Sequence, residues 1–198
     1  MKRKTYLFID GSNLYAGQYE LFGPRVYLDF PRFIRHLTKT LKLSLDKIYF
    51  YASYSPQSKK PTSREKLYLK NEALFYRSVK QTTNVIFFTG YHSKTSGKEK
   101  EVDVKLAVDI VHFAHLNKYS DLFLMSGDAD FMYAIKIAQQ LGKHIAVVAL
   151  QNRVPQRFAY HYETYILLFN AKKIPLKHSK GQKIRPVYLE KDTIIQRI

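Results

Sequence analysis

The stretch "FLMSGDADF", Phe123–Phe131, joins an apolar run to a Ser-Gly turn and two aspartates, in a chain with a formal net charge of +17. The apolar run is typical of a strand. The turn and Asp128 are typical of a helix start, because an aspartate side chain accepts a hydrogen bond from the first turn. A stretch near the N-terminus, "YLFIDGSNLY" (Tyr6–Tyr15), repeats the arrangement with Asp10. Both stretches predict strand, turn and helix, with the acids at the carboxyl end of the strand.

The rest of the chain alternates between two patterns. Runs rich in β-branched and aromatic residues predict six strands: Thr5–Ile9, Lys47–Ser53, Val85–Thr89, Asp121–Met125, His144–Leu150 and Thr164–Phe169. Segments of helical period lie between them: Leu28–Leu41, Arg64–Gln81, Val102–Leu116 and Ala129–Leu141. We therefore predict an α/β fold of three α/β/α layers around a mostly parallel sheet of five or six strands. In such sheets function gathers beyond the carboxyl ends of the strands.

The length of 198 residues is typical of one domain. We assign it to residues 1–170. Residues 171–198 are expected to form a basic C-terminal extension, packed on the domain or flanking it, because eight Lys or Arg follow from Lys172 onward.

Charge and cysteine content narrow the function classes. The chain has 33 Lys plus Arg against 16 Asp plus Glu, which favours a polyanionic partner such as nucleic acid. A membrane partner is not expected, because no basic amphipathic helix with a strong apolar face stands out. The lack of cysteine excludes disulfides, thiolate metal sites and thiol catalysis. The apolar stretch near the N-terminus is too short for a signal peptide, and we expect a cytoplasmic protein.

Acids are the minority charge, so their positions are informative. Each has a structural interpretation: Asp128 and Ser126 cap a helix, and Asp103 lies in a first helical turn, where the helix dipole favours it. Several carboxylates in one cleft need a cation, because charges 4 Å apart repel by about 4 kcal/mol at an effective dielectric constant of about 20. Oxygen ligands without cysteine indicate Mg²⁺ or Mn²⁺. We interpret Asp109, on the apolar face of its helix, as a structural acid paired with backbone or a lysine; a direct ligand role is the less favoured alternative.

Three motifs together resemble a known family: "FIDGSNLY", "KEVDVKLAVDIV" and "LMSGDADFMYAIKIAQQLGKHIAVVAL". They are similar to the NYN domain of the LabA-like group, in the PIN-like nuclease superfamily, from about Lys4 to Phe169. The resemblance implies the strand order 3-2-1-4-5. It also implies catalytic and metal-binding roles for Asp10, Asp103 and Asp128, with Asp130 as a fourth acid bound directly or through water, and Asn13 and Ser12 orienting Asp10, the metal or a substrate phosphate.

Basic loops are predicted at the same edge of the sheet. The segments "SPQSKKPTSREK" and "HSKTSGKEK" each follow a predicted strand, so their cations are expected to hold phosphates. The predicted substrate-binding residues are Ser12, Ser126, Lys59, Lys60, Arg64, Lys94, Lys98 and Lys100. Nearby tyrosines, which would stack on unpaired bases, are Tyr51, Tyr54 and Tyr91.

The sequence therefore predicts a metal-dependent nuclease that hydrolyses phosphodiester bonds. RNA is favoured over DNA by the resemblance alone. A nucleic-acid-binding module without turnover is an alternative. A small-molecule phosphatase is less favoured, because "DGS" lacks a second acid two residues after Asp10. The sequence makes no prediction of oligomeric state.

Overall fold

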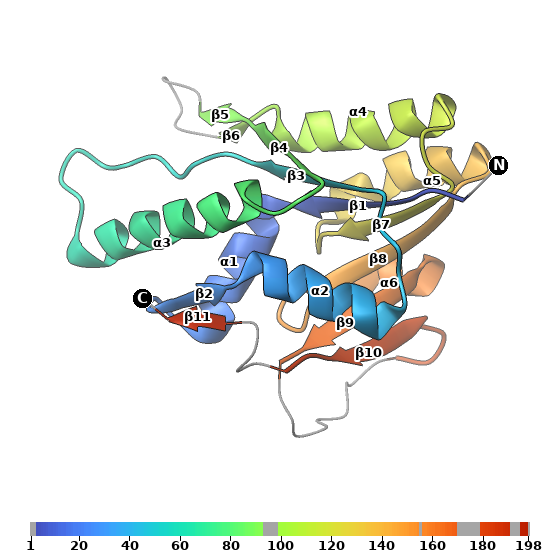
Figure 1. The fold of residues 1–198 in the computed structure, drawn as a ribbon. Helices are drawn as coiled ribbons and strands as arrows, with labels where there is room; N and C mark the ends of the chain where they lie inside the picture. Colours follow the sequence, from blue (N-terminus) through green and yellow to red (C-terminus); the bar gives the residue numbers. More distant parts are fainter. Residues whose placement is uncertain (1–2, 93–98, 155, 170–178, 191–194, 198) are drawn as a thin grey trace.

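The computed structural model describes residues 3–92, 99–154, 156–169, 179–190 and 195–197. Its centre is a seven-stranded sheet of order β10-β9-β8-β7-β1-β3-β4, with every neighbouring pair parallel (Figure 1). The strands are β1 Thr5–Asp10, β3 Lys47–Ala52, β4 Val85–Thr89, β7 Asp121–Met125, β8 His144–Leu150, β9 Glu163–Leu168 and β10 Ile184–Tyr188.

The predicted α/β class and strand order are confirmed. When the strands of this sheet are numbered along the chain, their order is 7-6-5-4-1-2-3. In the opposite direction the order is 3-2-1-4-5-6-7, which begins with the expected 3-2-1-4-5. The sheet has seven strands rather than five or six, because β10 comes from the region after residue 170. Pro186 interrupts the strand pattern of β10, and an edge strand tolerates proline because its outer N–H groups need no partner.

Helices cover both faces of the sheet (Figure 1). Those of one face pack with the larger apolar core and are α1 Gly11–Phe22, α2 Phe30–Leu41 and α3 Ser63–Lys80. Those of the other face pack with a second core and are α4 Val102–His115, α5 Met132–Gln140 and α6 Gln156–His161. Two small antiparallel pairs complete the fold: β2 Val26–Leu28 with β11 Ile195–Arg197, and β5 Tyr91–His92 with β6 Glu99–Lys100.

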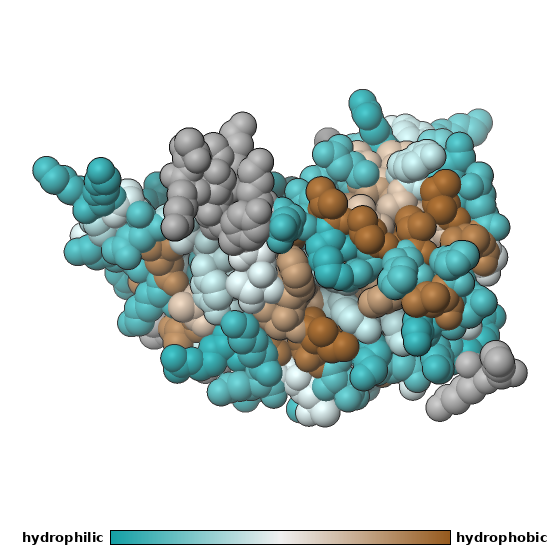
Figure 2. Space-filling model, turned by 90° about the horizontal axis from the view of Figure 1, so that it is seen from above, coloured by the Kyte–Doolittle hydropathy of each residue, from teal (hydrophilic) through white to brown (hydrophobic). Residues whose placement is uncertain are grey.

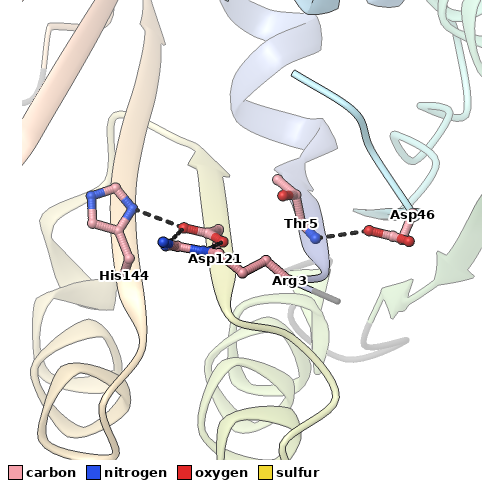
Figure 3. Close-up of polar contacts among 5 residues, drawn as sticks. All are labelled: Arg3, Thr5, Asp46, Asp121 and His144. Carbon is pink, nitrogen blue, oxygen red and sulfur yellow. Dashed lines mark hydrogen bonds and ion pairs between the residues drawn. The ribbon is translucent and has the colours of Figure 1, made fainter. Parts of the chain in front are cut away.

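Polar contacts join the strands at their amino ends (Figure 3). Arg3 donates to both oxygens of Asp121 on β7, at 3.0 and 2.5 Å, and His144 Nδ1 on β8 lies 3.4 Å from Asp121 Oδ1. The backbone N–H of Thr5 donates to Asp46, just before β3, at 2.9 Å. Asp46 and Asp121 thus have structural roles at the edge opposite the expected site.

No helix in the described part of the chain is both long enough and apolar enough to span a membrane.

Buried tyrosines make the fold sensitive to alkali. Burial raises the pKa of the Tyr51 phenol, and the nearby Asp109 carboxylate raises it further; burial also raises the pKa of Tyr119. In the unfolded chain both phenols ionise at about pH 10. Above that pH the unfolded state loses protons that the folded state keeps, so stability is full below about pH 10 and falls above it.

We expect each of these tyrosines to lower the free energy of unfolding by up to about 1.4 kcal/mol per pH unit above about pH 10. Urea unfolding followed by circular dichroism on both sides of that pH measures the effect. A free energy of unfolding that stays constant across this range would contradict the prediction.

Candidate acidic site at the carboxyl edge

The carboxyl ends of β1 and β7 bring two of the predicted motifs together. These strands are adjacent and parallel, with Ile9 opposite Met125 in the register. Asp10 ends β1 and is 5% exposed, while Ser126 directly follows β7 and is 1% exposed. The Ser126 hydroxyl donates to Asp10 Oδ2 at 2.8 Å. This buried hydrogen bond joins the two motifs across 116 residues of sequence.

Asp10 also begins helix α1. Its Oδ1 accepts from the backbone N–H of Asn13 at 2.9 Å, which is an N-cap interaction. The Asn13 side chain in turn accepts from the backbone N–H of Gly127 at 3.2 Å. Asn13 therefore links the start of α1 to the loop after β7, and Ser12 lies half-buried beside it. Contacts of Ser12 or Ser126 with a substrate stay predictions.

Asp128 belongs to the same hydrogen-bond network as Asp10 and Ser126. Its backbone N–H donates to Ser126 Oγ at 3.0 Å, and its Oδ1 accepts from the N–H of Asp130 at 2.9 Å. The second contact caps the short 3-10 helix η1, Ala129–Phe131, that precedes α5. The capping interpretation of Asp128 is therefore confirmed. Asp128 is half-buried and Asp130 is exposed, so both carboxylates reach solvent.

Asp103 is exposed in the first turn of α4. Among the residues that the structure describes, no group of three or more His, Asp or Glu side chains lies close enough to hold a metal ion. The predicted aspartates therefore do not form a closed set of ligands here. Their chemistry still fits Mg²⁺ or Mn²⁺: Mg²⁺ usually keeps several waters and binds through one or two carboxylates plus substrate phosphates. Asp10 and Asp128 carry two carboxylates that would fit this kind of binding.

Asp109 has the structural role that we expected. It is 5% exposed and accepts hydrogen bonds from the Tyr51 hydroxyl, at 2.9 Å, and from Lys105 Nζ, at 2.5 Å. These contacts tie α4 to strand β3. The prediction that Tyr51 stacks on bases is wrong, because its ring is 1% exposed and its hydroxyl is bonded to Asp109. Tyr54, by contrast, is 40% exposed.

The loop after β3 presents two of the predicted cations, Lys59 and Lys60, to solvent. Helix α3 holds this loop in place, because Ser55 bonds to Glu72 and Ser58 bonds to Glu65. The backbone and hydroxyl bonds from Ser58 lower the pKa of Glu65.

Other predicted cations are placed less completely. Arg64 is exposed at the start of α3 and lines a surface hollow with Arg25 and Glu20. Lys94 and Lys98 lie outside the described residues. Only the backbone of Lys100 is described, in β6, and the same holds for Tyr91 in β5.

Arg153 is a residue of this edge that the sequence analysis missed. It follows β8, and its carbonyl oxygen lies 2.4 Å from the position that a Cβ on Gly127 would occupy. Its guanidinium pairs with Glu20 of α1 at 2.5 Å. The signal in the sequence was its position three residues after the end of an apolar strand, because the loops that follow such strands emerge at the same edge as Asp10 and Asp128.

The close approach of the Arg153 backbone requires a glycine at position 127. We expect Gly127→Ala to lower the free energy of unfolding by about 1–3 kcal/mol, because the new methyl group would overlap the backbone of Arg153. Gly17→Ala is the matched control: its methyl group would meet side-chain atoms, Leu150 Cδ1 and Arg153 Cγ, and not backbone, and alanine favours the helix. Chemical unfolding of both variants measures the difference. Equal losses would contradict the prediction.

Fold and site together define a class of protein. A parallel sheet containing the order 3-2-1-4-5, with helices on both faces and aspartates at the ends of β1 and β7, is the architecture of PIN-like nuclease domains. The NYN domain family matches residues 4–174. The chain therefore belongs to the NYN domain family, within the PIN-like superfamily and its LabA-like group.

Two known proteins are similar along most of the chain. The low amplitude and bright protein LabA of Synechococcus elongatus is 22% identical over 167 residues, which cover 81% of each chain. The crystal structure of a protein of unknown function from Vibrio parahaemolyticus superimposes with a TM-score of 0.57 at 17% identity. That comparison covers 98% of this chain and 96% of the other, and it supports the fold alone.

Proposed function

We propose that this chain is a metal-dependent ribonuclease whose site lies at the carboxyl edge of β1 and β7. Asp10, Asp128 and Asp103 would hold Mg²⁺ or Mn²⁺, with Asp130 as a further acid. The observation that carries the proposal is the buried bridge of Ser126 between Asp10 and the backbone of Asp128. It keeps two carboxylate-bearing residues from distant motifs at one edge, although the chain has only 16 acids against 33 cations.

Some residues of the chain would orient the acids of the site, and others would bind the substrate. Asn13 and Ser126 orient Asp10 by hydrogen bonds to its two oxygens, from the backbone N–H and the hydroxyl respectively. The exposed Lys59 and Lys60 attract the phosphate backbone, so substrate binding is expected to weaken steeply with salt. A divalent ion bound there would lower the pKa of a bound water, supplying hydroxide for attack on the phosphate, and neutralise charge on the leaving oxygen.

RNA is the proposed substrate for two reasons. The net charge of +17 favours a polyanion, and NYN domains act on nucleic acids, with RNA favoured by the family. An RNA oligonucleotide and a DNA oligonucleotide of the same sequence, incubated with the chain in Mg²⁺, Mn²⁺ or EDTA, test the proposal. We expect the RNA to be cleaved with either ion and to stay intact in EDTA. Cleavage that EDTA leaves unchanged would refute the metal-dependent site.

A second candidate is a binding module without turnover. It is favoured by the lack of a closed three-ligand group among the described residues. It predicts RNA binding that weakens as salt rises, with no cleavage in Mg²⁺ or Mn²⁺. A third reaction, phosphomonoester hydrolysis, is tested in the same series with p-nitrophenyl phosphate. Turnover of that compound without RNA cleavage would instead indicate a phosphatase.

A further inference from the structure

Exposed apolar side chains concentrate on the layer formed by α4 and α5. Of the nine large apolar residues that are exposed in the described part of the chain, five lie between residues 104 and 141. They are Val104, Val108, Leu116, Tyr133 and Leu141, and they are between 41% and 73% exposed. Figure 2 shows apolar residues gathered over one half of this face. Such a group, rimmed by polar residues, typically marks an interaction surface.

A hollow of about 720 Å³ lies between the two helices. Small residues, Ala107 and Ala134, line it together with larger apolar ones, Val108, Val111 and Ile137. His112 and His115 also line it, and so does Asp130, the further acid of the proposed metal site. On α4 the apolar residues Val104, Val108 and Val111 repeat at intervals of four and three. Ala134, Ile137 and Leu141, on α5 and at its end, repeat at intervals of three and four. This is the spacing with which helices pack side by side in bundles. The groove therefore has the shape of a binding site for further helices.

Charge narrows the choice of occupant. The described residues that line the hollow include no lysine or arginine, and the one charged residue among them is Asp130, although the chain has a net charge of +17. Nucleic acid or an acidic protein would be attracted to lysine-rich surfaces, such as the loop after β3 with Lys59 and Lys60, rather than to this hollow. An apolar, nearly neutral face is compatible with another face of the same kind.

We propose that the α4–α5 face binds the same face of a second copy of this chain across a two-fold axis. A two-fold contact is self-complementary, so each copy supplies both the exposed side chains, such as Tyr133, and the groove that receives them. This arrangement brings together two hollows whose lining, among the described residues, contains no lysine or arginine. Two chains of +17 repel each other less in such a pairing than in one that brings lysine-rich loops together.

Sedimentation equilibrium tests the proposal. We expect the wild-type chain to dimerise in the micromolar range, and Val108→Asp to raise the dimer dissociation constant at least about tenfold, because the change enters the contact twice. Tyr133→Asp, at 73% exposure, is a second variant that should weaken the dimer without unfolding the chain. Tyr160→Asp is the matched control, since Tyr160 is 46% exposed on α6 and does not line the groove. Circular dichroism confirms that each variant is folded.

Salt dependence gives an independent readout. Repulsion between the two copies is screened as salt rises from about 0.05 to about 0.5 M, so the dimer should become stronger, whereas binding of RNA should become weaker. A wild-type chain that stays monomeric at high micromolar concentration would overturn the proposal. So would equal effects of Val108→Asp and Tyr160→Asp on the dimer, or a wild-type monomer whose affinity for RNA falls in Val108→Asp.

Discussion

Asp10→Asn and Asp128→Asn should each lower divalent-dependent cleavage of RNA by at least about a thousandfold, equivalent to about 4 kcal/mol in the activation free energy. Each substitution removes a carboxylate from a residue that Ser126 contacts, through the side chain of Asp10 or the backbone of Asp128. A neutral amide binds Mg²⁺ or Mn²⁺ poorly in comparison. Initial rates on a labelled RNA oligonucleotide, measured across metal concentrations, give the ratio. Unchanged cleavage in both variants would remove Asp10 and Asp128 from the site.

The substitutions are chosen to leave the fold intact. Asparagine is as good an N-cap as aspartate, so the variant at residue 10 can still accept from the backbone of Asn13. Asp121→Asn is the matched control, because Asp121 lies at the amino end of the same strand β7 and contacts Arg3 and His144 instead. We expect this control to keep full activity. If this control lost as much activity as Asp128→Asn, the loss would be caused by disturbance of strand β7 and not by removal of a carboxylate from the site.

Phe50→Ala should lower the free energy of unfolding by about 3–5 kcal/mol, the usual cost of removing a fully buried phenylalanine. Phe50 on β3 is completely buried and packs against the rings of Phe30, Phe75 and Phe87, with centroids 5.7, 6.1 and 5.0 Å away. A Cβ on Gly11 would come within 2.2 Å of its ring. The ring therefore packs directly under the turn that follows Asp10.

Urea or thermal unfolding measures this loss, with Ile86→Ala as the control. Ile86 lies on the adjacent strand β4 but is 43% exposed, so its truncation should cost well under about 1 kcal/mol. Equal losses in the two variants would contradict the assignment of Phe50 to the central core.

The strands of the central sheet were largely predictable from the sequence. Strand β8 begins and ends at the predicted residues, His144 and Leu150, and β4 and β7 also match their predicted ranges. Strands buried on both faces must be apolar throughout, which makes the pattern easy to recognise. Strand β10 was missed, because an edge strand carries a weaker pattern and this one contains Pro186.

Contacts between distant segments were not predictable. The sequence indicated that Asp109 is a structural acid, but its partner Tyr51 was expected to face nucleic acid. Both alternate faces of a strand can be apolar in a parallel sheet, so the pattern does not reveal which one a tyrosine occupies. Arg153 was missed for a similar reason: its proximity to Gly127 depends on a loop that no periodicity describes.

The sequence alone determined that acids follow two apolar strands, because the order of residue types decides where a strand ends and a helix begins. It also determined the excess of positive charge and the absence of cysteine. The tertiary structure decided that these acids belong to one network, through the hydroxyl of Ser126 between Asp10 and Asp128. That outcome depends on β1 lying next to β7 in the sheet. Strand order is set by how the helices pack on the sheet. These contacts join residues far apart in the sequence, so a local pattern does not encode them.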